Sequence, residues 1–214
     1  PIGATATQLS ALYKTVCVTT ANHKARCWGS NSDGQAGIGD NNDLGTSGNP
    51  INTALSDIPL PEDIRELATG IFHVCGITES SGLLCWAGGG YGKLGQGNTD
   101  DIGDDPGEIA ALSAVDIVAP QGYDAGDNIV NQVTMTTRST CIINLSGQVK
   151  CWGSGANGTS GHGDTDRYGA GDSGREYPSS RDAWLDFGSP VIDIAGDGGN
   201  NSPHTCALTA AGTI

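Results

Sequence analysis

The spacing of the cysteines is the feature of this sequence that most constrains its fold. In three pairs, nine residues separate the two cysteines, and a tryptophan follows the second cysteine directly. The pairs are Cys17 with Cys27, Cys75 with Cys85, and Cys141 with Cys151, followed by Trp28, Trp86 and Trp152. A seventh cysteine, Cys206, lies about one further period along the 214-residue chain. A repeat of this kind predicts a solenoid, a propeller or another array of similar units.

Short runs of β-forming residues surround the cysteines. The runs VCVTT, VCGIT, TCIIN and TCALT precede turn sequences such as NLSG, and KARCWG, LLCWAG and QVKCWG follow them. We expect Gly82, Gly147 and Gly212 to adopt the positive φ that such turns need, with Asn22 in the first repeat. The segment LPEDIRELATG at 60–70 fits a short strand better than a helix. The chain is therefore predicted to be all-β.

The repeats divide the chain into four predicted stretches. A first, partial repeat covers 1–45, the second 46–110, the third 111–175, and an incomplete fourth 176–214. The second cysteine of the fourth pair would fall just past Ile214, inside a hairpin. Since domain boundaries fall in exposed linkers rather than within hairpins, we expect the chain to be a section of a longer repeat protein.

A longer motif, with a Gly-rich tail after each tryptophan, resembles that of a known family. Residues 70–108 read GIFHVCGITESSGLLCWAGGGYGKLGQGNTDDIGDDPGE. This stretch resembles the repeat of the regulator-of-chromosome-condensation (RCC1) superfamily, and most of all its extracellular Cys-Trp-Gly variant in bacterial and algal surface proteins. The resemblance covers essentially the whole chain and implies a β-propeller with four-stranded blades.

The resemblance leaves the number of blades open. The repeats are longer than is usual in that family, and the extra length lies in loops such as 99–114 and 165–182. We expect about three and a half disulfide-stapled, RCC1-type blades that form part of a propeller or of a tandem array. Each tryptophan of the motif is expected to pack against a neighbouring blade or disulfide.

The cysteine pairs are compatible with a disulfide, a metal site or a redox site, and the spacing favours the disulfide. Nine intervening residues across an antiparallel hairpin place two cysteines opposite each other, within disulfide range. Zinc ligands and redox pairs have shorter spacings. We predict a disulfide within each pair, and one from Cys206 to a residue beyond the chain end. Free thiols are the alternative. Disulfides in every repeat would indicate an oxidising compartment.

The loops that follow the Gly-rich tails carry acidic residues and amides in a repeated pattern. They read DNNDLG at 40–45, NTDDIG at 98–103 and DTDRYG at 164–169. Oxygen ligands two residues apart, with a glycine at the sixth position, are typical of calcium loops. The candidate ligands are Asp40, Asn42, Asn98, Asp100, Asp164 and Asp166. The alternative is that these residues only form turns, because the loops lack the glutamate that ends an EF-hand loop.

Three Asn-x-Ser/Thr sequences are candidates for N-linked glycans. They begin at Asn144, which we expect to be exposed in a hairpin turn, at Asn157 in a Gly-rich loop, and at Asn200. His73 and His204 each lie two residues before a cysteine, where the other repeats have Thr15 and Ser139. We expect these histidines to be structural. We find no catalytic motif and predict no enzymatic activity.

Charge limits the classes of partner. With 24 acidic and 10 basic residues, the net charge of −14 disfavours binding to nucleic acid or to an anionic membrane. No apolar run is long enough to span a membrane. The remaining features favour a protein partner, either another copy in a homo-oligomer or filament, or an extracellular protein.

The leading functional hypothesis is a secreted or cell-surface repeat protein with a structural or adhesive role, such as a segment of an extracellular filament. The alternative is a closed propeller that binds a protein through its loops. The RCC1 resemblance includes an extracellular β-lactamase inhibitor and nuclear exchange factors, and only the former suits an oxidising compartment. A third reading is a calcium-dependent lectin or enzyme.

Overall fold

The computed structural model describes residues 2–51, 55–118, 129–171, 184–198 and 204–213. Antiparallel strands dominate this part of the chain, together with the three-residue 3-10 helices η1 (Gly90–Gly92), η2 (Ile109–Ala111) and η4 (Ala156–Gly158). The chain forms two compact units. Unit 1 comprises 1–89 and 100–114, and unit 2 comprises 90–99 and 115–214.

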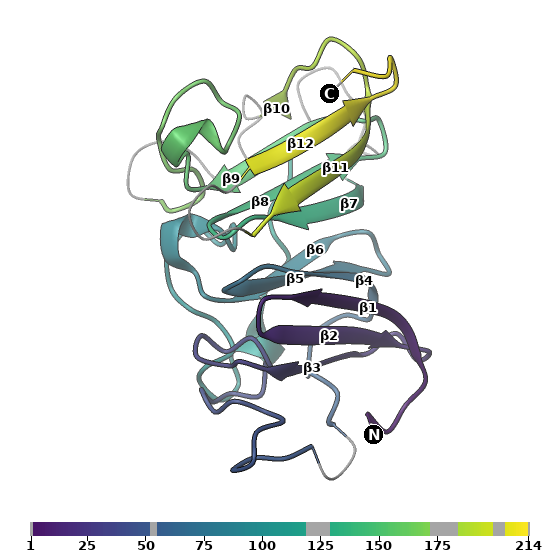
Figure 1. Ribbon diagram of the computed structural model, residues 1–214, viewed down its shortest axis with the longest axis vertical. Helices are drawn as coiled ribbons and strands as arrows, with labels where there is room; N and C mark the ends of the chain where they lie inside the picture. Colours follow the sequence, from purple (N-terminus) through teal and green to yellow (C-terminus); the bar gives the residue numbers. More distant parts are fainter. Residues whose placement is uncertain (1, 52–54, 119–128, 172–183, 199–203, 214) are drawn as a thin grey trace. The chain divides into compact units, whose positions relative to one another are not determined.

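Unit 1 contains two three-stranded sheets, ordered β1-β2-β3 and β4-β5-β6 (Figure 1). The strands are β1 (Ala6–Leu12), β2 (Thr15–Thr20), β3 (Ala25–Gly29), β4 (Ile64–Thr69), β5 (His73–Thr78) and β6 (Leu83–Ala87). In each sheet, consecutive strands pair antiparallel. Each sheet is therefore a meander, as expected for successive hairpins in one repeat.

Unit 2 also contains two antiparallel sheets. In the described residues, its first sheet has four strands and its second sheet has two. One sheet has the order β10-β9-β8-β7, and the other pairs β11 with β12. The strands are β7 (Val130–Met135), β8 (Ser139–Asn144), β9 (Val149–Gly153), β10 (Trp184–Leu185), β11 (Val191–Asp197) and β12 (His204–Thr209). The prediction of an all-β fold made of RCC1-type blades is confirmed by these four sheets.

The central strands are the most buried. Every residue of β5 and of β8 is buried, as are all residues of β6 and β9. The first strand of each sheet also has the same irregularity, a register shift close to its start. A β-bulge at this position increases the local twist of the strand.

The turn between the second and third strands has the same form in three sheets, and a side chain at its first position explains it. Thr20, Thr78 and Asn144 each accept a hydrogen bond from the backbone N–H four residues later. This interaction is a side-chain version of a backbone turn.

The same turn corrects two of the predicted positive φ positions. Gly147 and Gly212 adopt positive φ as expected, but His23 does so in the first repeat in place of Asn22, and Ser81 in the second in place of Gly82. The hydrogen bond to the first side chain of the turn fixes the length of the turn at five residues. The fourth of these residues therefore takes positive φ, whichever residue type it is.

Glutamine side chains join neighbouring sheets within each unit. In unit 1, Gln8 on β1 donates to the carbonyl oxygen of Leu67 at 2.7 Å and accepts from its N–H at 2.9 Å. In unit 2, Gln132 on β7 makes the same two bonds to Ile194, both at 3.2 Å. The backbone groups of the adjacent first strand are thereby satisfied between two sheets.

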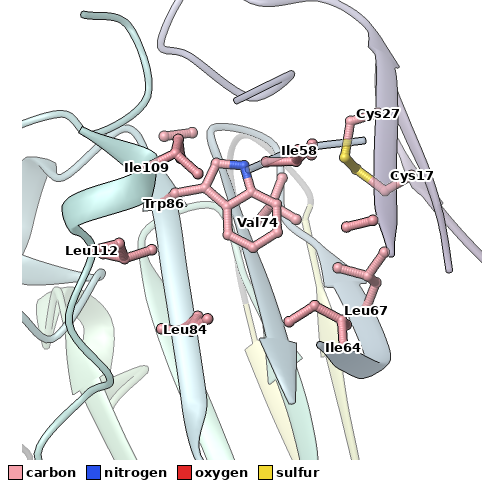
Figure 2. Close-up of a cluster of buried hydrophobic side chains, with 12 residues drawn as sticks. Cys17, Cys27, Ile58, Ile64, Leu67, Val74, Leu84, Trp86, Ile109 and Leu112 are labelled. Atoms are coloured by element: carbon pink, nitrogen blue, oxygen red, sulfur yellow. A yellow bond between two sulfur atoms is a disulfide. The ribbon is translucent and has the colours of Figure 1, made fainter. Parts of the chain in front are cut away.

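The core of unit 1 lies between its two sheets. Figure 2 shows Trp86 at the centre, surrounded by apolar residues of both sheets and of the loops, with the Cys17–Cys27 disulfide close by. In unit 2, a second core cluster joins the Cys141–Cys151 disulfide to Val191, Ile194 and Ala207 of the β11–β12 hairpin.

Candidate protein-binding site

The three cysteine pairs are disulfide-bonded, as the spacing predicts. The bonds join Cys17 with Cys27, Cys75 with Cys85, and Cys141 with Cys151, with a Cα–Cα distance of 4.1 Å in each. In every case the two cysteines are direct partners in the ladder between the second and third strands. Cys206 is exposed and unbonded in β12, and its predicted partner beyond Ile214 stays a prediction.

Two of the three motif tryptophans are buried, and both make the same hydrogen bond. The indole N–H of Trp86 donates to the carbonyl oxygen of Gln35 at 3.1 Å, and that of Trp152 to Lys93 at 3.0 Å. Gln35 and Lys93 occupy corresponding positions in the Gly-rich loops. The packing role is therefore confirmed for these two residues. Trp28 is only half-buried.

The candidate calcium ligands take part in turns. Asp40 accepts a hydrogen bond from the N–H of Asn42 at 2.8 Å, and Asp164 accepts one from Asp166 at 3.0 Å. Asn98 and Asp100 occupy the corresponding positions of the second loop. Across the described ranges, no three His, Cys, Asp or Glu side chains are grouped so as to hold a metal ion. The geometry supports turn formation, and calcium binding stays a prediction.

A second aspartate in two of these loops has a role that the sequence pattern did not single out. Asp43 accepts a hydrogen bond from the N–H of Asn31 at 2.9 Å, and Asp101 accepts one from Gly89 at 2.7 Å. Both aspartates occupy the fourth loop position, where the third loop has Arg167. Their equal distance from the Gly-rich tail is the signal that could have identified them.

The structure corrects one glycosylation candidate. Asn144 is only 1% exposed, and its side chain accepts bonds from Ser146 and Gln148 while it donates to the Gln148 side chain. The expectation that it is exposed was wrong, because it is the buried residue that forms the turn. Asn157 is exposed and stays a candidate. Asn200 lies outside the described residues.

The two motif histidines lie in different environments. His73 is fully buried at the start of β5. The side chain of His204 is 63% exposed, and its Nδ1 lies 3.9 Å from a carboxylate oxygen of Asp197. Equivalent positions in the sequence therefore do not share one environment.

Lys150 is a fully buried lysine of unit 2. Lys150 on β9 has no exposed surface, and its Nζ lies 4.8 Å from the ring centroid of Trp184 and 3.5 Å from the Val118 carbonyl oxygen. Burial lowers the pKa of Lys150 to about 8, and the negative charge of Asp116 partly opposes that shift. The sequence alone showed no sign of this environment.

The turns between the first and second strands carry exposed aromatic or cationic residues. In unit 1, Tyr13 is 62% exposed and Phe72 is 38% exposed. In unit 2, exposed Arg138 ends the turn between β7 and β8, and its guanidinium lies 5.1 Å from the ring centroid of Tyr91, a 37% exposed residue of η1. We call these positions the turn face of each unit. Aromatic residues and arginine are enriched at the energetic centres of protein interfaces.

Backbone hydrogen bonds hold each turn face to the Gly-rich loop beside it. The N–H of Gly88 donates to the Phe72 carbonyl oxygen at 2.8 Å, and that of Ser154 to Arg138 at 2.9 Å. No sequence motif marks these residues as functional, although Phe72 and Arg138 both lie three positions before the first cysteine of a pair. A turn anchored in this way presents its side chains at low cost in conformational entropy.

Sequence comparisons find relatives in plants and animals. The chain is 32% identical over 147 residues to the ultraviolet-B receptor UVR8 of Arabidopsis thaliana, covering 68% of this chain and 28% of UVR8. It is 28% identical over 141 residues to the human E3 ubiquitin-protein ligase HERC2, covering 66% of this chain and 2% of HERC2. The chain thus spans only a small part of either relative. No family model matches it.

Comparison of the fold with solved structures finds an RCC1 propeller among the similar folds. Human WBSCR16 matches with a TM-score of 0.65 at 17% identity, covering 96% of this chain and 45% of that structure. Yeast RCC1 (Prp20), in its complex with Kap60, matches with a TM-score of 0.64 at 13% identity, covering 97% of this chain and 42% of that one. No helix in the described ranges is long and apolar enough to cross a membrane. Sequence relatives, fold and repeat motif agree that the chain is built from RCC1-like propeller repeats.

Proposed function

We propose that this chain is a protein-binding repeat module of a secreted or cell-surface protein, with a structural or adhesive role. The observation that carries the proposal is the disulfide at the centre of three successive hairpins. Disulfides persist in oxidising compartments and are rare in the cytosol and nucleus. Three such bonds in one RCC1-like array support an extracellular site of action.

The turn faces support a protein as the partner. Their exposed aromatic and cationic side chains sit on anchored turns, within a chain whose net charge of −14 is unsuited to nucleic acid. Among the related folds, yeast RCC1 binds Kap60, and its properties include binding to Gsp1p and histones. A self-assembled filament or homo-oligomer is the form of protein binding that suits a structural role.

The alternative is a closed propeller that binds one extracellular protein, in the manner of an inhibitor. The turn faces favour it, because exposed aromatic and arginine side chains are typical of protein-binding surfaces. Calcium at the acidic loops and a glycan on Asn157 are compatible with either form. Neither form requires an enzymatic step, and we propose none.

The disulfides are tested on the protein from its natural source. Peptide mapping by mass spectrometry without reductant should recover each pair as a linked peptide. Free thiols at the six paired cysteines would overturn the extracellular assignment. Chelation of calcium tests the acidic loops separately: an unchanged melting temperature would remove calcium from the proposal. Enzymatic deglycosylation should lower the mass of the peptide that contains Asn157 if it carries a glycan.

Self-association is tested by sedimentation of the purified chain over a range of concentrations. Tyr13→Ala and Phe72→Ala together should weaken association at least tenfold. Leu145→Ala is the matched control, because Leu145 is 60% exposed but lies in a turn at the other end of its sheet. A chain that stays monomeric at all concentrations would favour the single-partner alternative. Equal effects of the two sets of changes would exclude the turn face.

A further inference from the structure

Unit 1 contains a groove of about 270 Å³ to which none of the features described above assigns a role. Three segments line it: 37–39 in the first Gly-rich loop, 56–59 ahead of β4, and 105–110 around η2. Its volume lies below the range of about 300–1,000 Å³ that is typical of small-molecule sites. A groove of this size suits a single long side chain.

The walls of the groove are apolar and held in place. Ile38 and Pro59 are exposed in it, whereas Ile109 is buried and belongs to the core cluster of unit 1 (Figure 2). The N–H of Gly39 donates to the Gly103 carbonyl oxygen at 3.1 Å, which joins the first Gly-rich loop to the loop ahead of η2. A groove that is already formed costs little conformational entropy when it binds a ligand.

Glu108 fixes the loop at the acidic rim of the groove. Its carboxylate accepts hydrogen bonds from the N–H of Gly103 at 2.7 Å and from that of Asp105 at 3.1 Å. Asp105 is exposed and lines the groove, and its own carboxylate has no partner in the part of the chain that the structure describes. This carboxylate is therefore held at the groove and available to a ligand.

The groove carries an excess of negative charge. Asp57 also lines it, but Arg26 balances that charge, since its Nε lies 2.7 Å from one carboxylate oxygen. By contrast, no carboxylate of 101–108 except that of Asp100's neighbours in sequence needs a cation to fold, and within the described ranges none of them is in an ion pair. Burial raises the pKa of Asp104, and the negative charge of Glu108 is among the causes that raise it further. A cation at the groove would meet a favourable potential.

An apolar wall beside carboxylates without ion pairs fits a side chain that has a long aliphatic stem and a cationic head. Arginine fits best, because its planar guanidinium can donate to one carboxylate through two N–H groups. We propose that the groove binds an arginine side chain of a protein partner, with its stem against Ile38, Pro59 and Ile109 and its guanidinium at Asp105. This inference rests on the protein-binding role proposed above and adds the chemistry of the partner, and it involves neither the turn faces nor the compartment.

The probe is a short peptide of glycine, serine and alanine with one central arginine and blocked ends, so that the guanidinium is its only charge. Backbone-amide NMR of the whole 214-residue chain should show saturable shifts at Ile38, Gly39 and Ile109. Replacing the arginine with citrulline keeps the shape but removes the charge, and it should weaken binding about tenfold. No saturable shift at the groove, or equal binding of the two peptides, would overturn the proposal.

Carboxylate variants of the chain locate the guanidinium. Asp105→Asn keeps the size of the side chain but removes its charge, and it should weaken binding about fivefold. The matched control is Asp33→Asn, which lies in the first Gly-rich loop outside the groove lining and introduces the residue that the third loop has at Asn157. This control should leave binding unchanged. Unchanged binding of Asp105→Asn at an unchanged melting temperature would contradict the assignment.

Ala110 and Ala111 offer a second matched pair. Both are exposed residues of η2, but only Ala110 lines the groove. Ala110→Arg places a guanidinium and its stem in the groove and should abolish saturable binding, whereas Ala111→Arg makes the same change of charge beside the groove and should weaken binding only slightly. Equal losses for the two variants would mean that the peptide responds to net charge alone, which would contradict a groove site.

A metal ion is the competing occupant. Calcium chloride added at constant ionic strength should leave the peptide bound, and displacement of the peptide by calcium would overturn the inference. Sedimentation keeps the proposed function separate. If self-association depends on Tyr13 and Phe72 while the peptide fails to bind, the arginine site is wrong and the turn faces are unaffected.

Discussion

Trp86 fills the space between the two sheets of unit 1, whereas the described residues of unit 2 leave a cavity of about 230 Å³ between β9, β10 and the β11–β12 hairpin. Each has a disulfide cysteine on one wall, an aliphatic residue of the next sheet on the other, and a Gly-rich loop at its polar end. The two sites differ in the strand that covers them. In unit 1, β6 supplies Trp86, whereas β12 has no third strand beside it in the described chain.

This difference shows that a blade does not complete its own core. In unit 1, both sheets and the loops supply the walls of the site, and the tryptophan that fills it comes from β6, the third strand of the second sheet. Stability in such an array is shared between neighbours and not contained in one repeat. Substitutions that have the same chemistry should therefore have different effects in different repeats.

Removing Trp86 should cause the largest loss. Trp86→Ala leaves a cavity between two sheets and should lower the free energy of unfolding by about 3–5 kcal/mol. Trp28→Ala removes a half-buried side chain and should cost about 1 kcal/mol. Urea unfolding of both variants measures the difference. Equal losses would mean that Trp28 and Trp86 contribute alike to stability, despite the difference in their burial.

Removing a disulfide should cause the next largest loss in the free energy of unfolding. Replacing both cysteines of a pair by alanine should cost about 2–4 kcal/mol in either unit. The loss should be greater for Cys17 and Cys27 than for Cys141 and Cys151, because Trp86 packs beside the first pair. Thermal unfolding measures this, with Cys206→Ser as a control of little effect. The reverse order would show that the filled site does not depend on its disulfide wall.

Lys150 allows a comparison of equivalent strand positions, since blade two has Leu84 there. The pKa of Lys150 falls from 10.5 to about 8 on folding. Between these values the unfolded chain binds more protons, so the free energy of unfolding should rise with pH from about 8 to 10.5. Lys150→Leu should abolish this rise and stabilise the protein by about 1–3 kcal/mol at pH 7. Denaturant unfolding across this pH range checks both effects, and an unchanged pH profile would show that Lys150 is not the titrating group.

The smallest effect is expected at Asn144. Asn144→Thr introduces the residue that Thr20, Thr78 and Thr209 supply in the other turns, so stability should change by less than about 0.5 kcal/mol. Asn144→Ala removes the side-chain acceptor and should cost about 1–2 kcal/mol. Chemical denaturation separates the two variants. A large loss for the threonine variant would mean that the four turns are not equivalent.

Much of the architecture was accessible from the sequence because it rests on local spacing. Nine residues between two cysteines define a hairpin register, and that register determines the disulfide. The hairpins, their order along the chain and the all-β class follow from the same repeat. The positive φ positions were less accessible. The N–H of Gly82 donates to the Thr78 hydroxyl, which places Gly82 at the fifth turn position, and Ser81 at the fourth position takes the positive φ.

Features that depend on neighbours in space could not be read in this way. Asn144 looks like an exposed sequon, but folding makes it the buried residue of a turn. Burial of Lys150 beneath Trp184 depends on a strand 34 residues further along the chain. The turn face brings together Tyr91 and Arg138, which no local motif connects.

By itself the sequence determined the repeat, the disulfide pairs and the family resemblance, because each depends on residues close together in the chain. The tertiary structure alone decided which tryptophans are buried, which loop carbonyl oxygens their indole N–H groups contact, and which side chains reach the surface. These are properties of the packing between sheets, and packing joins residues that the sequence keeps far apart.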